Sequence, residues 1–368
     1  MSQKFGEVVS AFVGDKNFED MGSYGEGHIN DTCLANVKLS DGKNVKLIFQ
    51  KINHNIFTNT DGLMNNILGV TEFLKDIIVK NGGDPDRETL TVVKTLDGKL
   101  LYNDSEGNYW RAYTFIDDTN CFQSIECDKG FYNCGVAFGN FQRQLANYPV
   151  DKLCETIVNF HNTESRIADL EKAIAADVKG RAKSVAKEIE FALSRKESAC
   201  EIVNLIREGK MPMRVTHNDT KLNNILFDKQ TGKALCIIDL DTVMPGAAAY
   251  DFGDSIRFGA STGAEDEVDL DKIEMDLHLY EVFAEGYLSV AKEFLTVTEL
   301  YSLSIGAKIM TYECGIRFLT DYLNGDTYFK IHRENHNLDR CRTQFKLVAD
   351  MEQKMDQMHE IIKQHSKQ

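Results

Sequence analysis

Proline is scarce in this chain: only 4 of its 368 residues are prolines, and the sequence has no repeat or low-complexity tract. Its nine cysteines form no Cys-x-x-Cys pair and no His/Cys cluster, which argues against a zinc site. No run of 18 apolar residues is present, so no membrane-spanning helix is expected. With 42% hydrophobic residues, the chain is expected to bury one large core or to form two lobes.

Basic residues are also few: the chain has 42 Lys and Arg residues against 57 Asp and Glu residues, which gives a formal net charge of −15. Such a chain repels nucleic acid and anionic membrane, so neither is an expected partner. ATP remains possible, since Mg²⁺ cancels part of its charge. The first seven residues lack the apolar core of a signal peptide, and free thiols suit a reducing compartment. We therefore expect a soluble, cytoplasmic protein.

The most informative stretch runs from Val215 to Asp241. Two short apolar runs, 225–227 and 235–238, flank a polar turn that contains a glycine. Apolar runs separated in this way predict a β-hairpin. Polar residues lie at both of its ends, before the first run and after the second. The hairpin would therefore hold several polar side chains in one rigid unit.

The polar residues at the ends of this hairpin have a distinctive spacing. His217, Asp219 and Asn224 form a His-x-Asp-x-x-x-x-Asn pattern, and Asp239 follows fifteen residues after Asn224. This is the catalytic spacing of the protein-kinase-like fold. Asp219 is predicted to accept the proton of an attacking hydroxyl, and Asn224 and Asp239 to bind Mg²⁺ beside the nucleotide phosphates. An ordinary turn is the alternative, but four polar residues in register favour the kinase-like site, in which His217 braces the loop.

Residues upstream of this stretch predict a small nucleotide-binding sheet. Strands are expected near 18–24, 29–38, 43–52, 91–95, 99–102 and 109–115. Gly25 and Gly27 lie in a turn between the first two strands and would let backbone N–H groups approach phosphate closely. A plain hairpin turn is the alternative. His28 either contacts substrate or phosphate or is an exposed turn residue.

The end of the third strand departs from the usual kinase pattern. Protein-kinase-like folds place a lysine there, aimed at the α- and β-phosphates. Here alternation puts Gln50 on the inward face with Ile48, and Lys51 is the other candidate for the phosphate contact. Because a glutamine brings no charge, Mg²⁺ would have to neutralise more of the phosphate charge.

An apolar strand that includes Tyr113, Phe115 and Ile116 then leaves the small sheet. Its backbone is predicted to face adenine as a hinge does, although a buried edge strand explains the same pattern. Beyond it the pattern is helical. Helices are expected near 3–13, 61–80, 129–147, 152–160, 166–178, 183–208, 270–293, 297–324 and 335–365. We therefore predict an α+β, two-lobed, protein-kinase-like fold, with an N-lobe over 1–116 that carries an antiparallel sheet and a mostly helical C-lobe over 117–368.

Two further patterns are interpreted as structural. Asp251 begins an Asp-Phe-Gly sequence, but Asp239 already occupies the expected metal position, so we predict that Asp251 is a helix N-cap that braces the loop. Glu313, Arg317 and Asp321 recur every four residues, which predicts a solvated ladder of weak ion pairs on a helix.

The segment 214–226 resembles the aminoglycoside phosphotransferase/choline kinase superfamily. Further blocks are similar to the N-acetylhexosamine 1-kinases within it, at 24–30, 238–242, 244–246, 251–262, 313–319 and 322–329. The resemblance spans nearly the whole chain. It implies transfer of phosphate from ATP, with Mg²⁺, to the anomeric hydroxyl of N-acetylglucosamine or N-acetylgalactosamine.

The same resemblance implies roles for individual residues. Asp219 is the catalytic base and a sugar contact, Arg317 and Tyr328 line the sugar site, and His28 lies beside them. The family also has a glutamine-type residue at the position of Gln50. The alternatives are a kinase of another acceptor (homoserine, choline, methylthioribose or an aminoglycoside) and a catalytically silent nucleotide-binding protein, although the intact motif argues against the latter.

Overall fold

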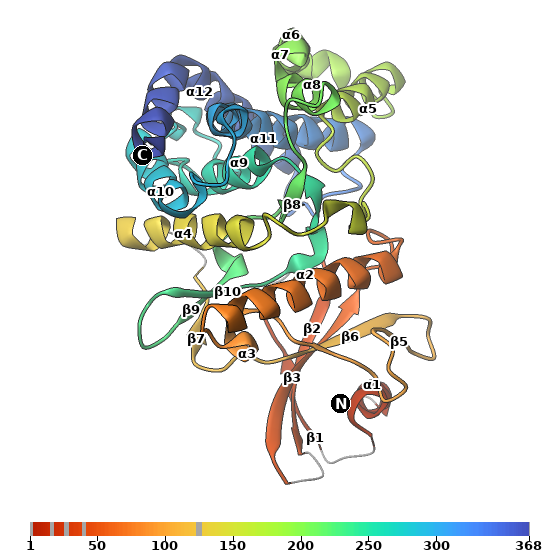
Figure 1. Ribbon diagram of the computed structural model, residues 1–368. Helices are drawn as coiled ribbons and strands as arrows, with labels where there is room; N and C mark the ends of the chain where they lie inside the picture. The colour runs from red at the N-terminus through yellow and green to blue at the C-terminus, as the bar shows by residue number, and fades with distance from the viewer. Residues whose placement is uncertain (1–2, 15–17, 26–28, 39–41, 123–126, 368) are drawn as a thin grey trace. The chain divides into compact units, whose positions relative to one another are not determined.

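The computed structural model describes residues 3–14, 18–25, 29–38, 42–122 and 127–367 (Figure 1). The chain forms two compact units. The first contains Met1–Asn120, Asn147–Val158 and Leu226–Met244, and the second contains Cys121–Ala146, Asn159–Ile225 and Pro245–Gln368. The predicted N-lobe of 1–116 falls within the first unit, which also takes in two later segments.

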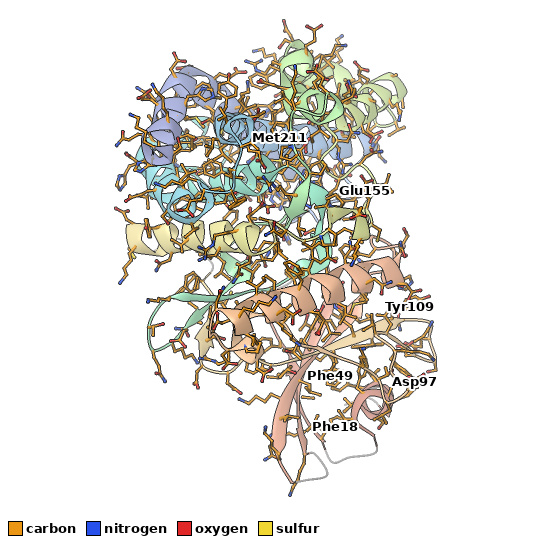
Figure 2. All side chains as sticks on the ribbon, viewed as in Figure 1. Phe18, Phe49, Asp97, Tyr109, Glu155 and Met211 are labelled. Atoms are coloured by element: carbon orange, nitrogen blue, oxygen red, sulfur yellow. The ribbon has the colours of Figure 1, made fainter. Side chains whose placement is uncertain are left out.

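An antiparallel sheet forms the centre of the first unit. Its strand order is β1-β2-β3-β6-β4, and β5 also pairs with β6. The strands are β1 (Phe18–Ser23), β2 (Asp31–Lys38), β3 (Asn44–Ile52), β4 (Val92–Val93), β5 (Tyr102–Asn103) and β6 (Tyr109–Thr114). Helix α1 (Gln3–Val13) covers one face, where the ring of Phe5 lies 5.6 Å from that of Phe49 and 6.1 Å from that of Phe18. Figure 2 labels both partners of Phe5 on this sheet.

Helix α2 (Thr60–Lys80) runs near β2 and β6 (Figure 1) and packs on the face opposite α1. It begins where the Asn59 side chain accepts a hydrogen bond from the N–H of Gly62 at 2.9 Å, which satisfies one of the unpaired donors of the first turn. The buried amide of Asn66 reaches back to the later segments, donating to the carbonyls of Cys154 at 2.8 Å and Val243 at 2.9 Å. Helix α2 therefore ties the two later segments to the sheet.

The predicted hairpin is confirmed as β9 (Ile225–Asp228) and β10 (Ala234–Ile237). Strand β7 (Thr119–Asn120) pairs with β9 as a third, antiparallel strand that the sequence did not predict. Arg87, in the short helix α3 (Pro85–Glu88), donates to the Asp228 carboxylate at 3.2 Å and to the carbonyl of Asp117 at the same distance. These contacts fix the polar turn of the hairpin within the first unit.

The second unit is mostly helical. Its helices are α4 (Asp128–Gln144), α5 (Thr163–Ala176), α6 (Ala186–Ser194), α7 (Lys196–Ala199), α8 (Glu201–Arg207), α9 (Ala248–Gly259), α10 (Leu277–Ala291), α11 (Val297–Asn324) and α12 (His336–Ser366). Helices α9 and α11 cross closely: a Cβ on Gly253 would lie 2.4 Å from the carbonyl oxygen of Gly306. Strand β8 (Arg214–Thr216) pairs with β11 (Met244–Gly246). No helix in the described part of the chain is long and apolar enough to cross a membrane.

Two predicted helices are wrong. The region 152–160 contains only the end of a 3-10 turn (Val150–Lys152), because the Asn66 amide binds both the N–H and the carbonyl of Cys154, which takes them out of helical hydrogen bonding. The region 183–208 is divided into a 3-10 turn and α6, α7 and α8. Arg195, between α6 and α7, forms an ion pair with Glu352 of α12 at 2.8 Å. Tertiary contacts override helix propensity at both places.

Candidate active site

The loop that follows β8 carries the predicted catalytic base, and its backbone is held by a buried carboxylate of α9. Asp251 is 1% exposed. It accepts hydrogen bonds from the N–H groups of His217 at 2.9 Å and Asn218 at 2.8 Å, and from the side chain of Gln142 at 2.7 Å. The prediction that Asp251 braces the loop is confirmed. Its predicted place as the N-cap is wrong, because Ala247 is the N-cap and Asp251 lies in the first turn.

A second carboxylate one turn further along α9 extends this support. Asp254 accepts from the N–H of Thr220 at 3.0 Å and from Nε of Arg257 at 3.1 Å. Burial opposes the charge of Asp254, but Arg257 and Lys221 outweigh it and lower the pKa of this carboxyl. The hydroxyl of Thr220 in turn donates to the carbonyl of Asp251 at 2.6 Å. The loop backbone from 217 to 220 is therefore bonded to α9 at three N–H groups.

The structure confirms that His217 braces the loop. Its side chain is fully buried, with ring centroids 5.9 Å from those of Phe138 and Phe141 in α4. Its Nδ1 accepts a hydrogen bond from the N–H of Asp219 at 3.3 Å. The buried imidazole therefore fixes the backbone of Asp219 next to it.

Asp219 is the residue that this support presents to solvent. Its side chain is 28% exposed, whereas His217, Asn218 and Thr220 are buried. Asn224 donates from Nδ2 to Oδ2 of Asp219 at 3.1 Å and to its carbonyl at 2.8 Å, and Lys221 forms an ion pair with Oδ1 at 2.8 Å. The carboxylate of Asp219 is the main cause of a raised pKa at Lys221. Asp219 and Asn224, predicted as base and metal ligand, are therefore in direct contact.

The predicted ion-pair ladder on α11 is wrong, because two of its three members are buried. Glu313 is 1% exposed and accepts from the Thr163 hydroxyl at 2.5 Å, while its other oxygen lies 3.0 Å from Nδ1 of His161. Asp321 is 4% exposed. It accepts hydrogen bonds from backbone N–H groups of the turn at 327–329 and from the side chain of Asn337 at 2.9 Å. Helical spacing placed these carboxylates on one face but did not reveal that this face is covered.

Asp321 positions one of the predicted sugar contacts. Its carboxylate accepts hydrogen bonds from the N–H groups of Thr327, Tyr328 and Phe329 at 2.8–2.9 Å. The guanidinium of Arg317 lies 5.9 Å from the centroid of the Tyr328 ring, which is 59% exposed. The structure therefore brings Arg317 and Tyr328 together at the surface of the second unit.

The predicted metal ligand Asp239 lies in the first unit, at the end of β10. It is exposed and has φ and ψ of 58°, in the left-handed region that few residues with a Cβ adopt. Two residues on, the buried Asp241 forms an ion pair with Arg111 of β6 at 2.5 Å. Burial opposes the charge of Arg111, but the Asp241 carboxylate outweighs it and raises the pKa of Arg111, with a further contribution from Asp239.

The register predicted for the third strand of the sheet is confirmed. Gln50 shares a face with Arg111, which donates to Oε1 of Gln50 from Nε at 3.0 Å and from Nη2 at 2.8 Å. Nε2 of Gln50 donates to the hydroxyl of Thr32 at 3.1 Å. Lys51 forms an ion pair with Asp31 instead. Gln50 and Lys51 both stay predicted candidates for the contact with the nucleotide phosphates.

The predicted adenine-facing segment follows β6. Tyr113 and Ile116 are buried, and the ring of Phe115 packs edge-to-face against that of Tyr24 at 5.5 Å. Tyr24 precedes Gly25, whose φ of 78° favours glycine over residues with a Cβ. Gly27 and His28 lie outside the described residues.

A profile of the family described as "Phosphotransferase enzyme family" (APH) matches residues 84–288, more than half of the 368 residues. The chain belongs to this phosphotransferase family. The matched range contains the loop that carries Asp219, the hairpin and α9.

Solved structures share the fold of this phosphotransferase. An amicoumacin kinase in complex with AMP-PNP, Ca²⁺ and Ami is 13% identical over 96% of this chain and 94% of its own, with a TM-score of 0.59. A choline kinase from Cryptosporidium parvum is 12% identical, covering 92% and 90%, with a TM-score of 0.56. A spectinomycin phosphotransferase in complex with ADP and spectinomycin is 13% identical, covering 96% and 99%, with a TM-score of 0.56. At these identities the likeness shows the fold alone, and it confirms the predicted α+β kinase-like fold.

Two residues of this phosphotransferase, Asn224 of the second unit and Asp239 of the first, each carry oxygen atoms of the kind that Mg²⁺ prefers. Because Nδ2 of Asn224 points at Asp219, its side-chain oxygen is the atom left to act as a ligand, and Asp239 presents an exposed carboxylate. Oxygen ligands of this kind suit Mg²⁺, which is usually held by one or two protein groups together with substrate phosphates. Among the described residues, no group of three or more His, Cys, Asp and Glu side chains could hold a metal.

Three residues of the phosphotransferase were missed by sequence reasoning. Lys221 lies two positions after Asp219, and this spacing was the available signal. Arg111 lies in strand β6, and His161 lies in the turn before α5. Neither residue belongs to a sequence motif. Arg111 is found only through its pairing with Gln50 across the sheet, and His161 only through its contact with Glu313 of α11.

Replacing Asp251 by Asn tests the support of the loop. An amide would turn an N–H group toward one of the backbone donors, so we expect the free energy of unfolding to fall by roughly 2–4 kcal/mol. The rate of phosphate transfer should fall as well, because Asp219 would lose its fixed direction. Urea titration followed by circular dichroism measures the stability. Asp271→Asn, at an exposed carboxylate, is the matched control, and equal stability of the two variants would contradict the assignment.

Proposed function

We propose that this phosphotransferase is an ATP- and Mg²⁺-dependent kinase of N-acetylhexosamines. It transfers the γ-phosphoryl group to the anomeric hydroxyl of N-acetylglucosamine or N-acetylgalactosamine and releases the sugar 1-phosphate and ADP. The observation that carries the proposal is the partly exposed carboxylate of Asp219 on a loop whose N–H groups at 217, 218 and 220 are hydrogen-bonded to buried carboxylates. The resemblance of the blocks described above to the N-acetylhexosamine 1-kinases supports the choice of acceptor.

In this proposal Asp219 accepts the proton of the anomeric hydroxyl as the sugar oxygen forms its bond to the γ-phosphorus, and ADP leaves with the electrons of the broken P–O bond. A hemiacetal hydroxyl is more acidic than an ordinary alcohol, so a carboxylate is a sufficient base. Lys221 and Asn224 hold its two oxygens at 2.8 and 3.1 Å, which limits their rotation. General-base assistance of this kind contributes about 10²–10⁴-fold to the rate.

We assign the contacts to phosphate and adenine to residues of the first unit and the contacts to the sugar to residues of the second. Asn224 and Asp239 would hold Mg²⁺, which when bound neutralises phosphate charge. Gly25 and Gly27 would approach the phosphates, together with Gln50. The backbone of 113–116 would face adenine. Arg317 and Tyr328 would contact the sugar, with His28 beside them.

A neutral acceptor fits the charges of the second unit. The acidic stretch beginning at residue 265 would suit a cationic acceptor if its carboxylates were unpaired. Instead Glu265 lies 2.9 Å from Arg257, and Asp266 lies 3.0 Å from His336. The Arg317 guanidinium offers hydrogen-bond donors that suit sugar oxygens. These charges favour a sugar over choline or an aminoglycoside.

We also assign the protein to the cytoplasm. All nine cysteines are free thiols, which a reducing compartment maintains. ATP, the proposed phosphate donor, is supplied there.

ADP release across a panel of acceptors tests the proposed function. The panel contains both N-acetylhexosamines, glucose, galactose, choline, homoserine, methylthioribose and an aminoglycoside. We expect the highest kcat/KM with an N-acetylhexosamine, because the resemblance to that group of kinases is the most extensive. A higher value for any other acceptor would overturn the choice of substrate while leaving the phosphotransferase family unaffected.

Asp219→Asn removes the proposed base and keeps the size of the side chain. We expect kcat to fall by about 10²-fold or more, with nucleotide binding largely intact. Stopped assays with N-acetylglucosamine measure the turnover, and calorimetry with AMP-PNP measures the binding. A variant that phosphorylates the sugar at close to the wild-type rate would end the assignment of Asp219.

Arg317→Ala removes the proposed sugar contact. Loss of a charged hydrogen-bond donor should raise KM for the sugar roughly 10- to 100-fold and leave KM for ATP unchanged. Arg207→Ala is the control, because Arg207 forms an exposed ion pair with Glu164 elsewhere in the second unit. An unchanged KM for the sugar would show that Arg317 does not contact it and only packs against the rings of Phe160 and Phe329.

A further inference from the structure

A buried guanidinium lies beside the position at which the sequence lacks a lysine. Thr32, Gln50 and Arg111 occupy one row across β2, β3 and β6, as direct partners in register. Arg111 is 1% exposed and is the largest of the fully buried side chains. The sheet therefore carries a fixed positive charge one strand away from the expected lysine position, enclosed where it cannot reach a ligand directly.

Each part of this guanidinium has an assigned partner. Nε and Nη2 donate to Oε1 of Gln50, and Nη1 lies 2.5 Å from Oδ1 of Asp241. The other oxygen of Asp241 accepts from the side chain of Asn30 at 2.6 Å, and Asn30 is itself held by the N–H of Asn53 at 2.9 Å. Arg111 thus joins the amide of Gln50 to the carboxylate of Asp241.

Asp241 anchors the turn that presents Asp239. The left-handed backbone of Asp239 is unfavourable for a residue with a Cβ, so contacts outside the turn help to hold it. Besides the ion pair, the carbonyl of Asp241 accepts from the Thr156 hydroxyl at 3.4 Å, and the carbonyl of Val243 accepts from Asn66. Of these contacts, only the one from Arg111 brings a charge.

A role in stability alone does not explain the pair. Buried ion pairs are frequently no more stabilising than apolar residues of the same volume. An ion pair that fixes the turn of a metal-binding carboxylate contributes to metal binding instead. Groups that hydrogen-bond to a metal ligand set its orientation and thereby change the metal affinity.

We propose that Arg111 is a positioning residue for the magnesium–nucleotide complex. Through Asp241 it fixes the turn that presents Asp239, and through Oε1 it fixes the Gln50 amide with Nε2 as the donor. This rests on the proposed function only in taking Asp239 as a ligand of nucleotide-bound Mg²⁺; it does not depend on the sugar.

Two variants test this positioning role in the full-length chain. Arg111→Lys keeps the charge, but a single ammonium cannot replace the fork that serves both Gln50 and Asp241. Arg111→Met/Asp241→Asn removes both buried charges together, so no unpaired charge is left. Isothermal titration calorimetry with Mg²⁺ and AMP-PNP measures affinity without any acceptor, at a temperature below the unfolding midpoint of every variant. We expect both variants to bind about 10- to 100-fold more weakly.

The control is Arg195→Met/Glu352→Gln, which removes an Arg–Glu pair between α6 and α12. It should bind Mg²⁺–AMP-PNP as the wild type does. Wild-type affinity in a folded Arg111 variant would show that the residue is structural only and overturn the proposal, as would a wild-type chain that fails to bind Mg²⁺–AMP-PNP. Should the wild type bind this complex but phosphorylate no sugar, the sugar-kinase proposal fails and the role of Arg111 stands.

Discussion

Three hydrogen bonds from the backbone of the loop that carries Asp219 to two buried carboxylates of α9 are the constraint on which the position of Asp219 depends. A buried carboxylate is costly unless donors surround it, so Asp251 and Asp254 keep the loop in the one conformation that supplies those donors. Helix α9 is itself fixed by its crossing with α11, where Gly253 and Gly306 leave no room for a side chain. Helix packing thereby determines where Asp219 lies.

In the first unit, a buried carboxylate likewise lies close to Asp239. The exposed Asp239 follows a strand, and the buried Asp241 two residues later is paired with Arg111. In each unit a buried charged group is associated with the segment that carries a more exposed carboxylate: Asp251 and Asp254 bond the loop of Asp219, and Asp241 lies two residues after Asp239. Asp219 is predicted to be the base, and Asp239 is predicted to be a metal ligand.

The sequence was sufficient for features whose signal is local. The hairpin, the long helices α2, α11 and α12, the inward position of Gln50 and the bracing role of Asp251 all follow from spacing or alternation along the chain. The burial of Glu313 and Asp321 does not, because a spacing of four residues defines a helix face without showing what covers it. Arg111 and His161 matter through partners distant in sequence, and the breaks at 152–160 and 183–208 are likewise imposed by tertiary contacts.

The phosphorus NMR spectrum of the product formed from N-acetylglucosamine and Mg²⁺–ATP tests the central claim most directly. Our account predicts a phosphomonoester resonance that couples to the anomeric proton and grows in step with ADP. A phosphorus resonance that couples to protons on another carbon of the sugar, or the appearance of inorganic phosphate alone, would contradict it.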